Sequence, residues 1–427
     1  MNKSSRFQAQ FYLSAALLLA LAGCANQATT EHANHADADK KMATANVKPE
    51  AETCVGSQLE CAKTVTTAFD NKGALWIAYV SDKYLYLQSS KDKGQTFGPA
   101  VKVNPIQEGI AARDESRPKI KFDSENNLYL TWTSDIPNAK ERHNGNVRFS
   151  RSTDGGKTFS EPVTVNDENP EVAGHRFDSL AIGKKGEVFI AWLDARDKVA
   201  AKKANVEHLG SSVYYAWSDD GGKHFHPNKQ VAAHSCECCR LQTEIAPDNS
   251  PVVVWRHVFE GGIRDHALLK FKDWNTPAEI SRISYENWKI DACPHHGTGF
   301  SIGNDGSYHA VWFSNSATHQ GLFYGYSNNQ GKNFSKPVNF AKEGAGHPHV
   351  LAIGKRVFIV WQQFDGKQTS VQLIKSNDSG KTWGKAEVLA KTDKKADQPF
   401  LVSDGKAAYL SWKVAPQDYH LQRITDK

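Results

Sequence analysis

The sequence lacks an excess of charge of either sign. Of its 52 Lys and Arg, two fall in the first 23 residues, and the other 50 face 47 Asp and Glu, a net charge of +3. A chain with so little excess positive charge is not expected to bind nucleic acid, and we exclude that class of partner. It also has little long hydrophobic sequence, since the apolar stretch from Phe11 to Leu21 is too short to span a bilayer as a helix.

The first 23 residues have the organisation of an export signal. Lys3 and Arg6 form a basic start, the apolar stretch follows, and Leu-Ala-Gly-Cys at 21–24 closes it. This ending resembles the lipobox of bacterial lipoproteins, which implies cleavage before Cys24 and lipidation of its thiol. Ala25 after the cysteine implies the outer membrane in the Gram-negative sorting pattern. We therefore expect a signal peptide over 1–23 and a lipid-anchored protein of the cell envelope.

Residues 24–52 are rich in Ala, Asp, His, Asn and Lys and carry no apolar period. This composition is typical of a solvated tether between a membrane and a folded domain. The remaining residues, 53–427, are long enough for two domains, but internal repeats run through all of them and indicate one.

A short apolar strand that ends in an aromatic residue recurs through this domain. The copies lie roughly 50 to 60 residues apart, with Gly, Asn and Asp turns between strands and no long helical period. Repeats of this length, each with room for four strands, predict an all-β fold of the propeller type. The seven strands are Leu75–Tyr79, Leu128–Trp132, Val188–Trp192, Val252–Trp255, His309–Trp312, Val357–Trp361 and Ala408–Trp412.

One kind of tight turn occurs five times, with the pattern Ser-x-Asp-x-Gly-x-Thr-Phe and few departures from it. The Asp side chain can cap backbone N–H groups, the Gly can take a positive φ, and the aromatic can pack the turn against its sheet. The turns span 90–97, 152–159, 218–225, 327–334 and 376–383. The pattern resembles the Asp box, or BNR repeat, of sialidase-like β-propellers, which implies that each turn joins the third and fourth strands of a blade.

Seven aromatic strands predict seven blades, with the six blades usual for sialidases as the alternative. The last repeat, from Gln398 onward, offers about three strands and no Asp box. Residues 46–51 resemble the fourth strands of other repeats. We therefore expect an N-terminal strand to complete the last blade, which would close the ring and remove its free sheet edges.

The resemblance to sialidases also implies a glycan-hydrolysing site, and part of that site is missing. Sialidases need three arginines for the substrate carboxylate, a Tyr nucleophile with a Glu, and an Asp acid/base. Their Arg-Ile-Pro signature is absent from the first blade, where residues 61–69 read Cys-Ala-Lys-Thr-Val-Thr-Thr-Ala-Phe. Tyr419, Glu244 and Asp178 are only candidates for the other roles. Because a shared fold does not establish a shared activity, whether the protein is an enzyme stays open.

Three arginines stand where the innermost strands of consecutive blades begin. Arg117, Arg176 and Arg240 share this repeat position, so we expect them to project into the channel from the face opposite the Asp boxes. With His175 and His347 they would bind a carboxylate, sulfate or phosphate, for instance on an anionic glycan. The alternative is that each arginine pairs with a nearby carboxylate. The acidic neighbours are Glu115, Asp178 and Glu237.

Cysteine and histidine gather at the same repeat position in two adjacent blades. Because the linkers into neighbouring blades meet beside the channel, we expect their donors to come together at its mouth. Thiolate and imidazole suit copper as Cu(I) or zinc as Zn(II), although the spacing is not that of a zinc finger. The predicted metal ligands are Cys236, Cys238, Cys239, Cys293, His295 and His296.

Disulfides are the competing interpretation, because an exported protein meets an oxidising compartment and six of the 7 cysteines remain after Cys24. Cys238 or Cys239 would then pair with Cys293 between blades, or the two neighbours with each other. A local bond between Cys54 and Cys61 is also expected. The histidines would then be ordinary polar residues of the channel.

These patterns predict a lipid-anchored propeller that binds a metal ion or an anionic ligand at a channel mouth lined by Cys, His and Arg. One alternative is a divergent glycoside hydrolase of the sialidase type. The other is a disulfide-stabilised scaffold that contacts protein or glycan partners through exposed loops such as Asp194–Ser212. The membrane, reached through Cys24, is a partner in all three.

Overall fold

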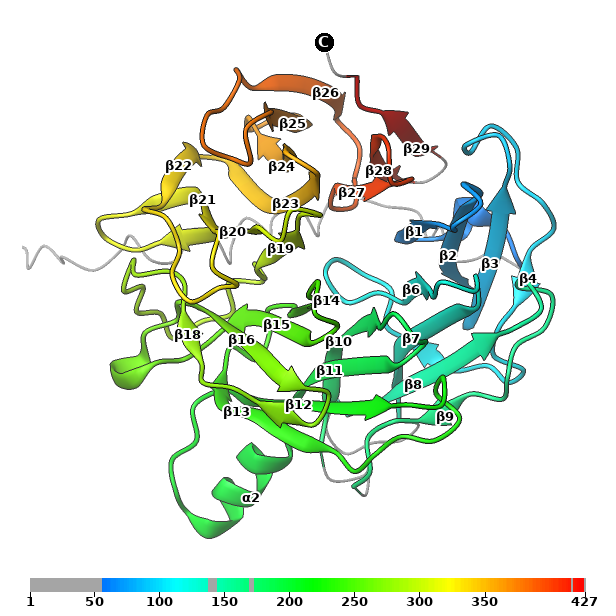
Figure 1. The fold of residues 1–427 in the computed structure, drawn as a ribbon, viewed down its shortest axis with the longest axis horizontal. Coiled ribbons are helices and arrows are strands. Elements are labelled where there is room, and N and C mark those ends of the chain that lie inside the picture. Colours follow the sequence, from blue (N-terminus) through cyan, green and yellow to red (C-terminus); the bar gives the residue numbers. More distant parts are fainter. Residues whose placement is uncertain (1–55, 137–143, 169–172, 416–417, 426–427) are drawn as a thin grey trace, which may run out of the picture. The chain divides into compact units, whose positions relative to one another are not determined.

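The described residues form a β-propeller of seven blades, as predicted (Figure 1). The computed structural model describes residues 56–136, 144–168, 173–415 and 418–425, which all belong to the compact unit Thr53–Lys427. The sheets are antiparallel, and the innermost strand of each lies nearest the common axis. Among these residues no helix has the length and apolar character needed to cross a membrane.

The first four blades follow one another in chain order. Blade 1 contains β1 (Val65–Phe69), β2 (Leu75–Ser81), β3 (Tyr84–Ser90) and β4 (Val101–Lys102). Blade 2 contains β5 (Gly109–Ile110), β6 (Lys119–Phe122), β7 (Leu128–Asp135), β8 (Gly145–Ser152) and β9 (Val163–Thr164). Blade 3 contains β10 (His175–Ile182), β11 (Val188–Asp194), β12 (Ser211–Ser218) and β13 (Lys229–Ser235). Blade 4 contains β14 (Gln242–Ile245), β15 (Pro251–Arg256), β16 (His266–Asp273), β17 (Thr276–Pro277) and β18 (Ser281–Arg282).

The last three blades complete the ring. Blade 5 contains β19 (Gly299–Ile302), β20 (Tyr308–Asn315), β21 (Gln320–Ser327) and β22 (Val338–Ala341). Blade 6 contains β23 (Ala345–Ile353), β24 (Arg356–Phe364), β25 (Thr369–Ser376) and β26 (Glu387–Thr392). Blade 7 contains β27 (Phe400–Ser403), β28 (Ala408–Val414) and β29 (Asp418–Arg423). Two short 3-10 turns, η3 (Leu59–Cys61) and η4 (Glu260–Gly262), lie outside the sheets.

The aromatic strands of the repeats are the second strands of the blades, and their aromatic side chains form the core. Trp132, Trp192, Trp255 and Trp312 are all 0% exposed. Each packs in a cluster that spans two consecutive blades; Trp312, for example, lies with Phe300 of its own blade and residues of β15 and β16. The hydrophobic core is therefore divided among the blade interfaces, which is why a repeat cannot bury its apolar face alone.

The Asp-box turns join third and fourth strands, as expected. In the turn between β8 and β9, the Asp154 carboxylate accepts the Thr158 amide at 3.0 Å, and the Ser152 hydroxyl accepts the Gly156 amide at 2.9 Å. Gly156 has a φ of +78°, and a Cβ at this position would lie 2.5 Å from the Trp76 ring of blade 1. The turn thus fits closely against the preceding blade, which is a structural role.

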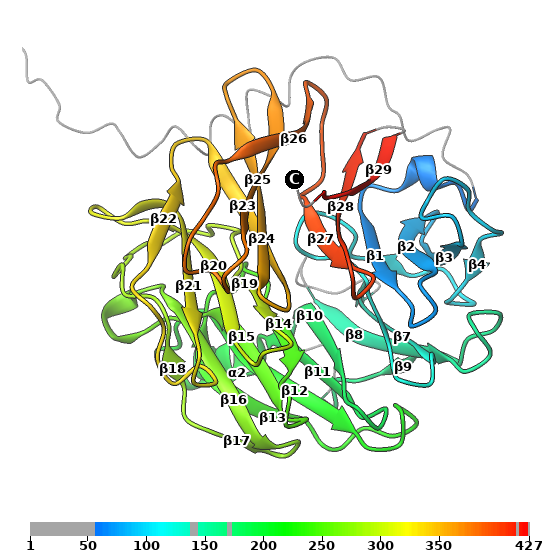
Figure 2. The ribbon, with the colours of Figure 1, turned by 45° about the horizontal axis from the view of Figure 1, so that its top comes forward.

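Blades 7 and 1 close the ring through side chains. The Thr67 and Ser411 hydroxyls are 2.8 Å apart, and the rings of Phe69 and Tyr409 lie 4.9 Å apart. Figures 1 and 2 show β1 beside β27 and β28. The strand expected at 46–51 lies outside the described residues, so completion of blade 7 by that segment stays a prediction.

The loop between β11 and β12 contains a helix that the repeat pattern did not predict. Helix α2 (Arg196–Ala204) projects from the ring (Figure 1) and ends at Asn205, which takes a left-handed conformation with φ 55°. Lys198 on this helix pairs with Glu237 at 2.6 Å. The helix therefore lies beside the cysteine-bearing linker that enters blade 4.

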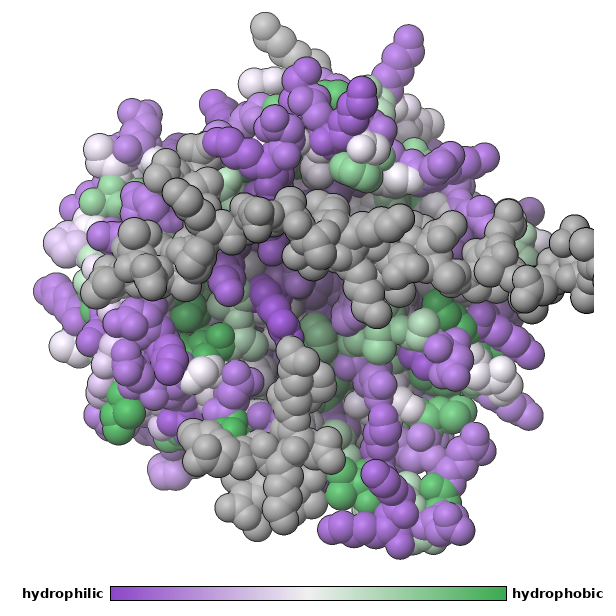
Figure 3. Space-filling model, turned by 180° about the vertical axis from the view of Figure 1, so that it is seen from behind, coloured by the Kyte–Doolittle hydropathy of each residue, from purple (hydrophilic) through white to green (hydrophobic). Residues whose placement is uncertain are grey.

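Antiparallel strands fix the two faces of the ring. The Asp-box turns and the turns after the first strands lie on one face, while the linkers between blades and the loops after the second strands lie on the other. In the view from behind (Figure 3), hydrophilic side chains cover most of the coloured surface, with apolar side chains in small patches between them. This pattern is typical of a surface that faces water.

Candidate metal centre

The linkers into blades 4 and 5 meet, as the repeat positions predicted. Cys236 follows β13 and Cys239 precedes β14, while Cys293 and His295 precede β19. The donor atoms of Cys238, Cys293 and His295 all lie within 4.8 Å of one another. Because both linkers lie on the face opposite the Asp boxes, the centre has the location that the sequence predicted.

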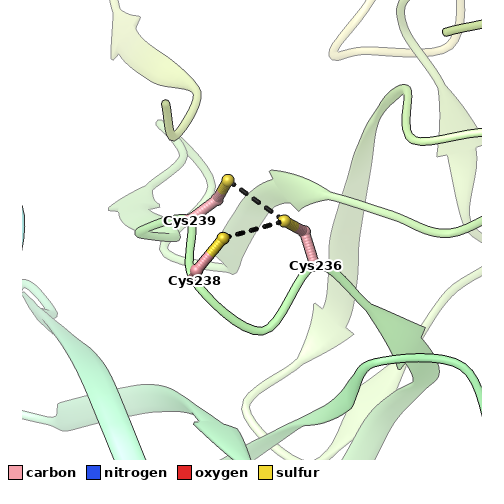
Figure 4. Close-up of side chains that lie close together, drawn as sticks. All are labelled: Cys236, Cys238 and Cys239. Atoms are coloured by element: carbon pink, nitrogen blue, oxygen red, sulfur yellow. Dashed lines mark hydrogen bonds between the residues drawn. The ribbon is translucent and has the colours of Figure 1, made fainter. Parts of the chain in front are cut away.

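Three thiols of the first linker form a buried trio (Figure 4). The Sγ atom of Cys236 lies 3.1 Å from that of Cys239 and 3.6 Å from that of Cys238. Cys236 is 0% exposed, Cys239 1% and Cys238 6%. One turn of backbone between β13 and β14 aims all three sulfur atoms at the same point.

The second linker adds an exposed thiol and an exposed imidazole. Cys293 and His295 are both on the surface, and His295 has a φ of 52°, unusual for a residue with a side chain. Cys236, Cys238, Cys239 and Cys293 are all free thiols, so the expected disulfide between these linkers is not formed. Cys61 is disulfide-bonded, whereas its predicted partner Cys54 lies outside the described residues.

A glycine allows the two linkers to approach closely. A Cβ on Gly297 would lie 2.3 Å from Cγ and 2.4 Å from the carbonyl oxygen of Arg240. Only a residue without a side chain fits this contact. The position of Cys293 and His295 relative to the trio therefore depends on Gly297.

Charged groups favour thiolates in the centre. The Arg264 guanidinium lies 3.5 Å from the Cys236 sulfur. Hydrogen bonds from the Cys238 and Cys239 thiols, with Arg256 nearby, hold the pKa of Cys236 well below its ordinary value. A hydrogen bond from Cys238 lowers the pKa of Cys293 to about 7. The same hydrogen bonds raise the pKa of Cys238, and burial raises the pKa of Cys239, so the negative charge of the trio concentrates on Cys236, the sulfur best prepared to bind a metal.

Sequence reasoning missed Arg264 and Arg256. Arg256 ends β15 and Arg264 lies in the loop before β16, 20 and 28 residues beyond Cys236. No spacing rule connects this hairpin with the linker. Only the antiparallel topology, which returns the second strand to the linker face, brings the guanidinium groups to the sulfur atoms.

Of the predicted metal ligands, His296 stands outside the centre. Its ring stacks between Phe313 and His347, with centroids 4.3 Å away on both sides, and its Nδ1 contacts the Pro294 carbonyl oxygen at 2.5 Å. Burial lowers the pKa of His296 to about 3. His296 therefore packs as a neutral aromatic ring while its neighbour His295 faces the thiols.

The arginines Arg117 and Arg240 both reach the axis of the ring, and each has an internal acidic partner. Arg117 makes a two-pronged ion pair with Asp397 at 2.8 and 2.6 Å, and Arg240 pairs with Glu115 at 3.1 Å. Both guanidinium groups lie over the Phe400 ring. For Arg240 the structure therefore agrees with the alternative interpretation, in which the arginine pairs with an acidic neighbour such as Glu115.

Glu115 of blade 2 contacts residues of three other blades at the axis. It lies on the segment between β5 and β6 and accepts the backbone amides of Arg240 at 3.2 Å and Gly297 at 2.9 Å. His347 Nδ1 of blade 6 lies 3.8 Å away. Burial would raise the pKa of Glu115, but Arg240 and His347 lower it to about 2. The carboxylate therefore fixes the linkers that carry the thiols.

Arg176 and His175 lie apart from the thiols, in blade 3. The charged neighbours of Arg176 are Asp135 and Arg113, and burial lowers its pKa. The buried His175 ring donates from Nδ1 to the Gly145 carbonyl at 2.6 Å and directs Nε2 at Asp194 and Glu168.

Those two carboxylates form a partly buried ion-pair group with helix α2. Arg196, at the start of the helix, contacts both Asp194 and Glu168. The Trp192 indole also donates to Asp194 at 2.8 Å. Burial lowers the pKa of His175, but Glu168 and Asp194 raise it above its ordinary value. Because Arg196 and protonated His175 together balance the two carboxylates, we interpret this group as the attachment of α2 to the ring.

The residues considered for sialidase chemistry are not assembled. Asp178 accepts hydrogen bonds from Thr131 and Thr133, and Tyr419 shares its hydroxyl with Thr67 and Ser411. Glu244 accepts a hydrogen bond of 3.3 Å from the Gln242 side chain. Each candidate is held by its own neighbours, and in the part of the chain that the structure describes no hydrogen bond joins any two of them.

Comparison with known proteins supports the fold and leaves the function open. No protein-family model matches the sequence, and no curated protein matches it. Among solved structures, an ulvan lyase of polysaccharide lyase family PL25 superposes with a TM-score of 0.55 at 12% identity, over 88% of this chain and 94% of that one. A Hadza microbial sialidase superposes with a TM-score of 0.51 at 12% identity, over 82% and 76%. At such identity the likeness describes the fold alone.

Proposed function

We propose that this protein is an exported, lipid-anchored β-propeller that binds a thiophilic metal ion, copper as Cu(I) or zinc as Zn(II), at the linkers into blades 4 and 5. The observation that carries the proposal is the convergence of free thiols from two blades. Thiolates around a tetrahedral zinc ion, with Zn–S bonds of about 2.3 Å, lie about 3.8 Å apart. The contacts of 3.1 and 3.6 Å made by Cys236 need only small adjustments to reach that spacing.

A metal site explains the centre better than disulfides do. Two disulfide bonds of about 2.05 Å, Cys236–Cys239 and Cys238–Cys293, would use all four sulfur atoms, but the four are free thiols. Guanidinium groups beside Cys236 favour thiolates, and thiolates are the form that metals bind. An imidazole, which a disulfide does not require, completes the donor set.

A metal site also fits better than an anion site. Arg117 and Arg240 are both ion-paired with buried carboxylates, Arg117 with Asp397 and Arg240 with Glu115. An anionic ligand at the axis would have to displace Asp397 or Glu115, which are 3% exposed. The thiols differ, because the charged group beside Cys236 is the Arg264 guanidinium, which favours the thiolate that a metal binds.

Metal analysis with a thiol count tests this function. We expect the full chain, purified without chelator, to contain copper or zinc, measured by plasma mass spectrometry. The double variant Cys236→Ser/Cys239→Ser should lose the metal held by the buried trio. His224→Thr, which removes an imidazole that is 88% exposed on the opposite face, should retain it. Absence of both metals, with no uptake by the reduced protein, would overturn the proposal.

Action on an anionic glycan is the second candidate, because the two solved propellers named above are a sialidase and an ulvan lyase. The test is release of a fluorogenic group from a sialoside and appearance of unsaturated products from ulvan. Activity that survives removal of the metal and the double cysteine substitution would favour this candidate over metal binding.

A further inference from the structure

The donors of the metal centre form two sets that share one atom. The first set is the buried trio Cys236, Cys238 and Cys239, and the second is Cys238, Cys293 and His295. Within each set all donor atoms lie within 4.8 Å of one another. The Cys238 sulfur is the only member of both, and it lies where the two linkers meet.

One metal ion does not fit all five donors. Two donors on the same ion, each with a bond of about 2.3 Å, can be at most about 4.6 Å apart. The five atoms fall into two sets, each within 4.8 Å, rather than into one, and each set needs only a small closure to hold an ion. An ion in the buried trio is therefore out of reach of the full second set, while Cys238 can bond to both positions, since a thiolate sulfur has lone pairs for two metals.

We propose that the centre binds two Cu(I) ions bridged by the Cys238 thiolate. This rests on the proposed function and specifies its ion and stoichiometry. The inner ion bonds to Cys236, Cys238 and Cys239, and the outer ion to Cys238, Cys293 and His295. Each ion displaces the remaining thiol protons, which leave to solvent, and forms S–Cu or N–Cu bonds; copper arrives as Cu(I), so no electron is transferred.

The number of donors favours Cu(I) over zinc. Each set offers three donors, a coordination number that Cu(I) accepts readily, whereas structural zinc takes four. Soft thiolates suit both Cu(I) and zinc, so the coordination number is what distinguishes the two ions. Zinc in either set would require a water or a rearrangement to complete its coordination.

The charges favour two monovalent ions. Four thiolates with two Cu(I) ions leave two negative charges, and two guanidinium groups, Arg256 and Arg264, lie beside Cys236 to balance them. Two zinc ions would instead neutralise the thiolates completely and leave both guanidinium groups unbalanced. A buried centre with excess charge of either sign is costly.

The two positions differ in access. The inner set is buried, whereas Cys293 and His295 are on the surface. The outer ion should therefore exchange with solution ligands faster than the inner one. Exchange proceeds by forming a bond to the incoming ligand as a bond to His295 or Cys293 breaks.

Copper stoichiometry tests the proposal. The reduced full chain in detergent is titrated anaerobically with Cu(I), and ions per chain are counted by native mass spectrometry. We expect two for the unmodified chain and for His224→Thr, and one for the double variant Cys293→Ser/His295→Ala. Cys236→Ser should also fall to one, because it removes an inner ligand only. X-ray absorption should show a copper–copper contribution that the one-ion variants lack.

Different results overturn different claims. Saturation at one ion in the unmodified chain, or two ions in Cys293→Ser/His295→Ala, would overturn the two-ion centre and leave metal binding intact. No copper and no zinc in any form would overturn the proposed function itself. Circular dichroism of each variant confirms folding, and the Cys238→Ser variant gives a second measure, since loss of the bridge should remove the copper–copper contribution.

Discussion

Glu115 and Arg240 lie 125 residues apart in the sequence and form an ion pair of 3.1 Å at the axis of the ring. The carboxylate comes from blade 2 and the guanidinium from the linker into blade 4, which also bears the buried thiols. Glu115 holds the linker into blade 5 as well, through the Gly297 amide. One carboxylate thus joins the centre of the ring to both halves of the candidate metal centre.

Glu115→Gln should destabilise the protein strongly. Removing one partner of a buried ion pair leaves the other charge uncompensated, which typically costs about 3–5 kcal/mol of unfolding free energy. Urea unfolding followed by tryptophan fluorescence measures the change. The matched control is Glu161→Gln on the surface, expected within about 0.5 kcal/mol of the unmodified protein. Equal stability of the two variants would contradict the role given to Glu115.

Gly297→Ala should separate the two linkers. The new Cβ would overlap Arg240 at 2.3 to 2.4 Å, and overpacking of this kind costs about 1–3 kcal/mol. We expect weaker metal retention as well, because Cys293 and His295 move away from Cys238. Competition with a chelator measures retention. Gly384→Ala is the control, since its Cβ would only approach the Lys375 carbonyl oxygen at 3.5 Å. Unchanged retention in Gly297→Ala would show that the contact does not position the donors.

Stability should fall in mild acid because of buried histidines. Burial lowers the pKa of His309 from 6.5 to about 4. In the unfolded chain His309 therefore takes up a proton below pH 6.5, whereas in the folded chain it stays neutral until the pH falls to about 4. Stability is complete above this window and is lost as the pH falls through it, by about 3 kcal/mol for a fully buried group.

The variant His309→Gln isolates this contribution. Its unfolding free energy should depend less on pH between 6.5 and 4 than that of the unmodified protein. Above pH 8 the difference between the two proteins should be constant, because histidine is neutral in both states there. Parallel curves between pH 6.5 and 4 would show that His309 does not take up a proton on unfolding.

Cys24→Ala should abolish membrane attachment. The lipid predicted on this thiol would anchor the protein, since the apolar stretch at 11–21 is too short to span a bilayer. Metabolic labelling with a fatty acid and fractionation of membranes measure the effect. Release of the unmodified protein into the soluble fraction, without label, would contradict the prediction. The substitution should leave copper stoichiometry unchanged, because the metal ligands belong to the propeller.

The sequence predicted the number of blades and the face that bears the candidate centre. The second strand of each blade alternates apolar residues and ends in Trp or Tyr, and this repeats because every blade packs the same way against its neighbours. Asp-box turns mark one end of the strands, so linkers such as 236–240 must lie at the other. The Asp194–Ser212 loop departs from this scheme because its helix α2 belongs to no repeat, and blades 2 and 4 depart from it because each contains five strands rather than four.

Individual contacts within the centre could not be predicted in the same way. His295 and His296 are adjacent and identical in type, yet one faces the thiols and the other stacks on Phe313 and His347. The choice depends on the positive φ of His295 and on rings supplied by blades 5 and 6. Neither appears in the spacing of the two residues.

The sequence by itself determined the ring, the positions of its linkers and the presence of thiols in two of them, because repeating side chains fix a repeating unit. Only the tertiary structure decided that Glu115 pairs with Arg240, that Arg264 lies beside Cys236 and that Cys238 belongs to two donor sets. These contacts join segments that become neighbours when the blades close into a ring, so no local pattern encodes them.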